Sequence, residues 1–210
     1  MLVLSTKIGC YDNIKYISQK RIQKLISDLD IELLTLSDIP EKIDEPSEFG
    51  ENAVEIAKNK AIYYWEATGR KMPALTQDDT MDFLGNVSPE DDPKTAIKEP
   101  VVKALGEYSI PNAIAYYSKL AERYGGNIDF AFRYGHGFVS EAGAKGVSSS
   151  LYAKLVKDPR GIDKVGKYPL RALTKLKIGN NYVYSEDATD EEKVAADSDI
   201  KRALVELLCS

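Results

Sequence analysis

The sequence predicts an α/β protein in which a mixed sheet is flanked by helices, and we expect residues 1–210 to form a single domain. The first indication is a β-α-β opening, in which apolar runs at 2–5 and 31–36 lie on either side of a helical apolar period over 12–29. Strands separated by a helix usually lie parallel in one sheet. The second indication is composition, because 43% hydrophobic and 29% charged residues are typical of a globular domain.

The next elements follow from helical periodicity and turn residues. Segment 51–68 has apolar residues at helical spacing and stops at Gly69, so we expect a helix there. Segment 74–76 is expected to form a short strand that delivers Asp78 and Asp79 to its carboxyl end. Ligands of such sheets collect at that edge, which makes the two aspartates candidates for a site.

The second half of the chain mixes helical and strand patterns around a loop at 86–94 that is rich in Pro, Asp and Asn. Segment 128–139 alternates like a strand with a glycine turn. The expected elements are helices at 95–108, 113–124 and 197–208, and strands at 128–139, 149–156 and 181–185.

Composition argues against several classes of function. The net charge of −5 is unfavourable for general binding to nucleic acid or to a membrane surface, although one small anionic ligand needs only a local cationic pocket. Cys10 and Cys209 lie far apart in the chain, which indicates free thiols in a reducing compartment. His136 is the only histidine, so a site with several imidazole ligands is excluded. The N-terminal segment has no signal-peptide pattern and no run is long enough to span a membrane, so we expect a cytoplasmic protein.

Acidic residues gather around the start of the helix expected at 51–68. Such acids either stabilise the helix through its dipole, by roughly 0.3–1 kcal/mol each, or act as ligands of a hard divalent cation. Asp78 and Asp79 differ from them, because adjacent carboxylates after an apolar strand repel each other unless a cation lies nearby. The four glutamates are Glu41, Glu45, Glu48 and Glu51.

Two lysines of the same expected helix are candidates to neutralise phosphate oxygens. Lys58 and Lys60 point about 200° apart on an ideal helix, so only one of them can face a given pocket. The face of Lys60 is compatible with the start of the helix. For either lysine, simple exposure to solvent is the alternative.

Three motifs between residues 38 and 83 resemble those of a known family. The motifs are DIPE at 38–41, FGENA at 49–53 and LTQDDTMDF at 75–83. They are similar, in this order, to the D-[IL]-P-E, T-F-x-E-N-A and D/E-D-[ST] segments of the inosine triphosphate pyrophosphatase family, whose members are house-cleaning nucleotide hydrolases. The third motif is the most specific of the three.

The resemblance implies a Mg²⁺-dependent hydrolytic site. Glu41 or Glu51 would hold Mg²⁺ together with Asp78 and Asp79, and Asp79 is favoured as the carboxylate that activates water. Counting back from the end of the expected helix aligns Lys60 with the catalytic lysine of the family, with Lys58 as the second choice. The implied catalytic residues are therefore Asp79, Asp78 and Lys60.

Weaker motifs supply the expected contacts to triphosphate and base. LVLST at 2–6 resembles the strand and threonine of the phosphate loop, VGKYP at 165–169 stands where members carry F-G-[WY]-D-P, and YVYSEDATDEEK at 182–193 resembles T-[FY]-A-E-x-x-x-x-E-K. Members then carry Ser-His-Arg, whereas this chain has the acceptor Asp199 in place of the histidine, which suits a base edge bearing an amino group. The implied substrate-binding residues are Thr6, Lys7, Lys15, Thr80, Tyr168, Lys193, Ser198 and Arg202.

The resemblance further implies an elongated, highly twisted mixed sheet with helices in two lobes, a central cleft and a homodimer. The expected reaction converts a nucleoside triphosphate, non-canonical purine nucleotides included, to a monophosphate and pyrophosphate. The expected partner is this small substrate, with no nucleic acid polymer and no membrane. Two alternatives stay open: a catalytically idle nucleotide-binding or regulatory relative with the same fold, and a phosphatase that acts on another phosphorylated metabolite.

Overall fold

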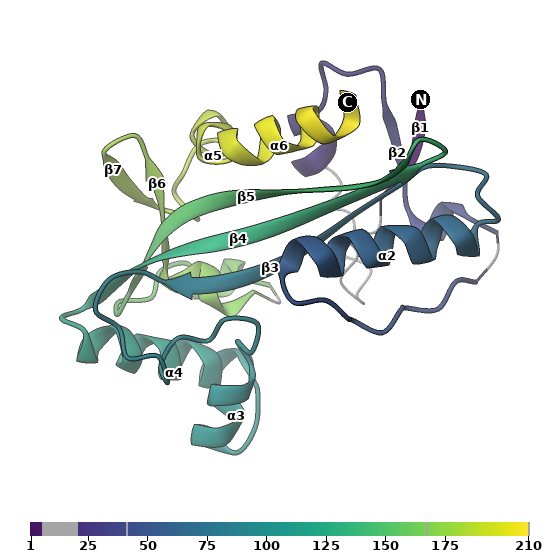
Figure 1. The fold of residues 1–210 in the computed structure, drawn as a ribbon. Helices are drawn as coiled ribbons and strands as arrows, with labels where there is room; N and C mark the ends of the chain where they lie inside the picture. The colour runs from purple at the N-terminus through teal and green to yellow at the C-terminus, as the bar shows by residue number, and fades with distance from the viewer. Residues whose placement is uncertain (6–20, 41, 167, 210) are drawn as a thin grey trace. The chain divides into compact units, whose positions relative to one another are not determined.

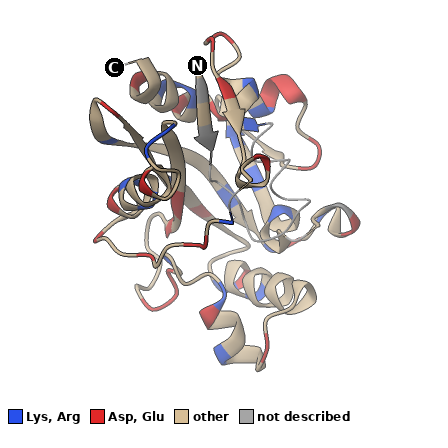
Figure 2. Ribbon diagram, turned by 90° about the vertical axis from the view of Figure 1, so that its right-hand side faces the viewer, with Lys and Arg blue, Asp and Glu red and all other residues tan. Residues whose placement is uncertain are grey.

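The computed structural model describes residues 1–5, 21–40, 42–166 and 168–209 of the chain. In this part the protein is mixed α/β, with one sheet flanked by helices, as the sequence predicts (Figure 1). Acidic and basic residues are spread over its helices, strands and loops (Figure 2). Of the helices so described, none combines the length and the apolar character that crossing a membrane requires.

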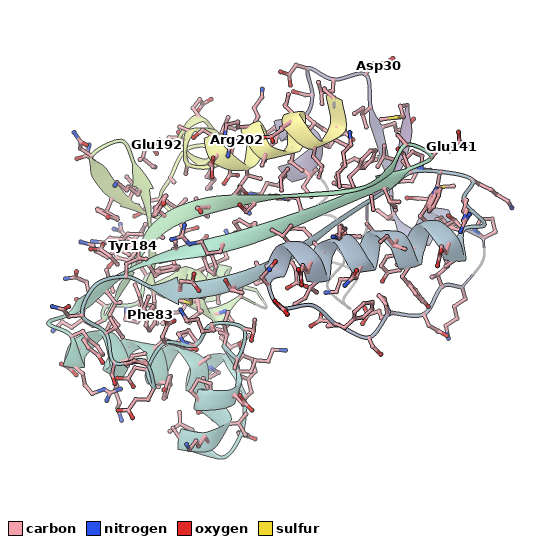
Figure 3. The ribbon with its side chains drawn as sticks, viewed as in Figure 1. Asp30, Phe83, Glu141, Tyr184, Glu192 and Arg202 are labelled. Carbon is pink, nitrogen blue, oxygen red and sulfur yellow. The ribbon has the colours of Figure 1, made fainter. Side chains whose placement is uncertain are left out.

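Seven strands form a mixed sheet in the order β2-β1-β3-β4-β5-β6-β7. β1 pairs in parallel with β2 and β3, whereas β6 pairs antiparallel with β5 and β7. A two-residue turn that contains Glu141 joins β4 to β5 (Figure 3). The strands are β1 (Leu2–Ser5), β2 (Glu32–Leu34), β3 (Ala74–Phe83), β4 (Asn127–Ser140), β5 (Gly143–Val156), β6 (Thr174–Ile178) and β7 (Asn181–Tyr184).

The helices begin at residues with suitable capping chemistry. The side-chain oxygen of Asn52 accepts hydrogen bonds from the backbone N–H groups of Val54 and Glu55 and so caps α2. Ser109 caps α4 and Thr189 caps α5 in the same way. Residues 21–25 are helical too, and the other helices are α2 (Ala53–Ala67), α3 (Glu99–Leu105), α4 (Ile110–Arg123), α5 (Asp190–Ala196), α6 (Ser198–Cys209) and the 3₁₀ turns η1 (Leu36–Asp38), η2 (Ile162–Lys164) and η3 (Pro169–Leu173).

The chain divides into two compact units, and β3, β4 and β5 each contribute residues to both. The expectation of a single domain stays a prediction. Unit 1 comprises Met1–Asp79, Tyr134–Ser149 and Asp199–Ser210, and unit 2 comprises Thr80–Arg133 and Ser150–Ser198.

In unit 1, α2 packs very close to β4 because two residues of that strand have no side chain. A Cβ atom on Gly135 would lie 2.1 Å from the carbonyl of Ala53, and one on Gly137 would lie 2.4 Å from the carbonyl of Ala57. Any other residue would therefore push the helix away from the strand. In the same unit α6 lies on the opposite side of the strands from α2 (Figure 1).

In unit 2, α3 and α4 cover one face of the strands. Tyr117 of α4 is fully buried and its hydroxyl donates to the carbonyl of Ile97. Aromatic rings of the strands extend this core, with Phe130 in edge-to-face contact with Phe83 and Phe132.

Several expected elements differ from the structure. β3 continues to Phe83 instead of stopping at 76, so Asp78 and Asp79 lie within the strand and not at its end. The glycines expected to form a turn in 128–139 lie inside the uninterrupted β4, where they permit the close approach of α2. The helix expected at 95–108 is reduced to α3, because Gly106 ends it with a left-handed backbone. β6 and α5 were not expected from the sequence.

The contact between α2 and β4 generates a prediction about stability. Gly137→Ala places a methyl group against the backbone of α2, and we expect the free energy of unfolding to fall by about 1–3 kcal/mol. Urea denaturation would measure the change. Ser148→Thr, which adds a methyl group at an exposed position of β5, is the matched control. Equal stability of the two variants would contradict this account of the packing.

Candidate functional site

The candidate site is built around the ammonium group of Lys60, which is held between two carboxylates. Its Nζ atom lies 2.5 Å from Oδ2 of Asp78 and 2.6 Å from Oε1 of Glu48. All three residues belong to unit 1. We call this group the Lys60 cluster. Two carboxylates around one ammonium give the Lys60 cluster a net charge of −1.

The position of Asp78 depends on a second contact between α2 and β3. The buried hydroxyl of Thr76 donates a hydrogen bond to the backbone carbonyl of Ala57. Side chains two residues apart on a strand point to the same face, so Asp78 shares the face of Thr76, and Asp79 belongs to the opposite face of β3. The backbone N–H of Asp79 donates to Oδ1 of Asp78, which orients the Asp78 carboxylate.

The position of Glu48 depends on a loop that is tied to the start of α2. The side-chain amide of Asn59 donates to the backbone carbonyl of Phe49, and the backbone N–H of Glu51 donates to the carboxylate of Glu55. Gly50 has a φ of +147°, and a Cβ atom there would lie 2.8 Å from the backbone nitrogen of Ile56. The FGENA motif therefore turns the chain back along the helix, and this reversal brings Glu48 to Lys60.

The electrostatics of the cluster keep Lys60 charged. Burial acts to lower the pKa of Lys60, but the hydrogen bonds from its ammonium to Asp78 and then to Glu48 outweigh burial, so the pKa lies above its ordinary value. The exposed fractions of the side chains are 19% for Lys60, 15% for Asp78 and 65% for Glu48. Lys60 is therefore a fixed positive charge at neutral pH and cannot serve as a proton acceptor there.

The other predicted residues fall into three groups. Thr6, Lys7, Lys15 and Glu41 lie outside the described residues. Glu51 is exposed at the start of α2, and Arg202 (Figure 3) lies on α6, where Asp199 and Glu206 bind its guanidinium. The predicted residues that belong to unit 2 are Thr80, Tyr168, Lys193 and Ser198.

The residues of unit 2 have their own surroundings. The hydroxyl of Thr80 lies 3.4 Å from Oδ1 of Asp82. Tyr168 is exposed at the start of η3, Lys193 is half-buried on α5, and Ser198 is exposed where α6 begins. Their roles in binding a base or a phosphate stay predictions.

The carboxylates of the cluster can be tested for their fit to Mg²⁺. In the described ranges, no group of three or more His, Cys, Asp or Glu residues is arranged to hold a metal ion. Mg²⁺ in nucleotide sites is usually bound by only one or two carboxylates, with substrate phosphates and water completing its shell. Asp78 and Glu48 already share one cation, Lys60, so this pair has the donor chemistry and proximity for such a site.

Sequence reasoning included Glu48 among the acids before α2 but did not select it. The signal that could have found it is the glycine and Asn-cap pattern of the FGENA motif, which indicates a chain reversal at the start of the helix.

Comparison of the chain with models of known protein families finds no match, and comparison with the curated proteins finds none either.

The contact between Lys60 and Asp78 predicts an energetic coupling that a double-mutant cycle can measure. Lys60→Met and Asp78→Asn, alone and combined, should show a coupling of about 1–3 kcal/mol in urea denaturation, because charge-assisted hydrogen bonds that are largely buried are strong. The cycle of Lys58→Met with Asp78→Asn is the control, and its coupling should be close to zero. Equal couplings in the two cycles would contradict the contact.

Proposed function

We propose that this protein is a Mg²⁺-dependent nucleoside triphosphate pyrophosphohydrolase, a divergent member of the inosine triphosphate pyrophosphatase family with the two-lobed fold of that family. The observation that carries the proposal is the Lys60 cluster. A permanently charged ammonium beside two carboxylates combines a group that neutralises phosphate oxygens with groups that hold a hard cation. The motifs at 38–41, 49–53 and 75–83 independently favour the same chemistry.

The proposed reaction breaks the bond between the α- and β-phosphates. Asp78 and Glu48 would hold the metal, and Glu41 and Glu51 stay candidates from the sequence resemblance. When bound, Mg²⁺ supplies a Lewis acid that polarises the α-phosphate. An attacking water gives its oxygen to the nucleoside monophosphate, while the bridging oxygen leaves with pyrophosphate.

The roles of Lys60 and Asp79 follow from charge and proton balance. Lys60 would turn from these carboxylates toward the phosphates, where its ammonium would offset the charge that develops on them. The resemblance assigns to Asp79 the acceptance of the water's proton, but Asp79 lies on the face of β3 opposite Asp78 and Lys60, so the proton would pass instead to a carboxylate of the Lys60 cluster or to solvent. The residues that the resemblance places around the base and the phosphate tail are Thr6, Lys7, Lys15, Thr80, Tyr168, Lys193, Ser198 and Arg202.

A nucleotide-binding protein without catalysis is the second candidate. The observation that favours it lies on α6, where Asp199 stands in place of the base-reading histidine and binds Arg202 at 2.8 Å. Such a protein would bind a nucleoside triphosphate, as calorimetry can detect, and would release no pyrophosphate. A homodimer in the cytoplasm stays the expectation for either candidate.

Pyrophosphate release from a panel of canonical and modified nucleoside triphosphates, with Mg²⁺, tests the proposed function. We expect turnover of at least one nucleotide, and a loss of about 10²–10³-fold in rate for Lys60→Ala and for Asp78→Asn, because each removes a charged group of the proposed site; Asp79→Asn, on the opposite face of β3, should lose less. Lys119→Ala, an exposed lysine on α4, should retain the rate of the unmodified protein. Undiminished turnover by both site variants would refute the assignment.

The metal ligands can be separated from the other groups by a Mg²⁺ titration. Asp78→Asn and Glu48→Gln should raise the Mg²⁺ concentration that gives half the maximal rate, because each removes a carboxylate from the proposed metal site. Lys60→Met should lower the maximal rate without raising that concentration, because the ammonium of Lys60 competes for the same two carboxylates. Glu141→Gln, in the exposed turn between β4 and β5, is the control. An unchanged Mg²⁺ requirement for Glu48→Gln would remove Glu48 from the site.

A further inference from the structure

Unit 2 carries a second concentration of functional side chains, on the sheet face opposite α3 and α4. Along β5, Ala153 and Leu155 are buried in the core, whereas Tyr152 and Lys154 point to the other face. The register of β5, β6 and β7 places lysines and tyrosines of all three strands side by side on this face. We call it the tyrosine–lysine face, and it consists of Tyr152, Lys154, Lys175, Lys177, Tyr182 and Tyr184.

Each tyrosine of this face has a cation over its ring. The ammonium of Lys154 lies 4.5 Å from the ring centre of Tyr182, and that of Lys175 lies 4.6 Å from the ring centre of Tyr184. Arg133 and Lys177 lie 5.6 and 6.0 Å from the ring centre of Tyr152, which is 46% exposed. Contacts of this kind are weak at exposed sites, so the exposed Lys177 can leave the ring of Tyr152 at little cost.

Two of the three rings are held in place by their hydroxyl groups. The hydroxyl of Tyr182 donates to Oδ1 of Asp129 at 3.2 Å, and that of Tyr184 (Figure 3) donates to the backbone carbonyl of Asp158 at 3.1 Å. Tyr152 lies between Arg133 and Lys177. The face therefore offers two rings that hydrogen bonds hold in place, Tyr182 and Tyr184, beside the exposed ring of Tyr152.

The charge of this face is opposite in sign to that of the whole chain. Lys154, Lys175, Lys177 and Arg133 supply four positive charges. Two carboxylates contact them: Asp129 at 3.5 Å from Lys154, and Asp82 at 3.5 Å from Arg133. Arg160 lies 5.5 Å from the ring centre of Tyr184, and Asp187 and Asp158 lie near the same ring, so the local balance is weakly positive although the chain carries −5. A polyanion would therefore be attracted to this face and not to the chain in general.

We propose that the tyrosine–lysine face binds single-stranded nucleic acid, with bases stacked on the tyrosine rings and phosphates held by the lysines and Arg133. Sheets that bind single strands combine exposed aromatic rings, on which bases of any sequence can stack, with cations along the phosphate path. Binding moves the ammonium of Lys177 from the ring of Tyr152 to a phosphate, and a base takes its place on the ring. This proposal is independent of the hydrolytic site, because no residue of the Lys60 cluster takes part.

Fluorescence anisotropy with a labelled 20-nucleotide oligo(dT) or oligo(U) at low salt tests the proposal. Tyr152→Ala should weaken binding by roughly 5- to 150-fold, the range that corresponds to the loss of one stacked base. Tyr152→Phe should retain the affinity, because the ring remains. Tyr63→Ala, an exposed tyrosine on α2 in unit 1, is the control and should bind like the unmodified protein.

Salt dependence gives a second measurement on the same complex. Four phosphate contacts predict that the logarithm of the association constant falls with the logarithm of the salt concentration with a slope of about −3, and Lys177→Ala should make this slope shallower by about 0.7. Equal affinity for a 20-base-pair duplex or for heparin would overturn the proposal in favour of unspecific attraction. Loss of stability without loss of binding in Tyr152→Ala would also overturn the proposal. So would a change in the self-association of this variant, measured by sedimentation, without a change in its affinity for the oligonucleotide.

Discussion

The arrangement of unit 1 depends on the close approach of α2 to strands β3 and β4. Two glycines of β4 let the backbone of α2 come within contact of the strand, and the hydroxyl of Thr76 joins β3 to the carbonyl of Ala57. With the helix fixed in this way, the ammonium of Lys60 lies 2.5 Å from the carboxylate of Asp78. A helix displaced by one side-chain thickness would leave a largely buried ammonium and a largely buried carboxylate without each other, which is costly for both.

The sequence identifies the elements whose pattern is local. The apolar run of β1, the capped helix α2 and the amphipathic helix α6 have boundaries close to the expected ones, because periodicity and capping act within a few residues. The full length of β3 was not predicted, since its second half is polar and is held by pairing with neighbouring strands. Gly135 and Gly137 were expected in a turn for a similar reason: their role depends on a helix that is distant in sequence.

The residues of the candidate site were also predicted from the sequence only where the pattern is local. Lys60 and Asp78 were selected from motif spacing, and the structure places them in contact. Glu48 was not selected, because its approach to Lys60 depends on how the loop folds back over α2 and not on any helical or strand period. The pairing of tyrosines with lysines on β5, β6 and β7 is also a product of strand register, and β6 itself lacks a distinct sequence signal.

The Lys60 ammonium has a consequence for ion selectivity. It acts as a tethered counterion, always present at high local concentration between Asp78 and Glu48. Any free ion that enters must displace it, and a monovalent ion such as potassium offers the two carboxylates no more charge than the ammonium already does. Only a small ion of higher valence gains enough from the exchange. At the proposed metal site, the resident lysine would thus exclude monovalent ions and leave the position open to a divalent one.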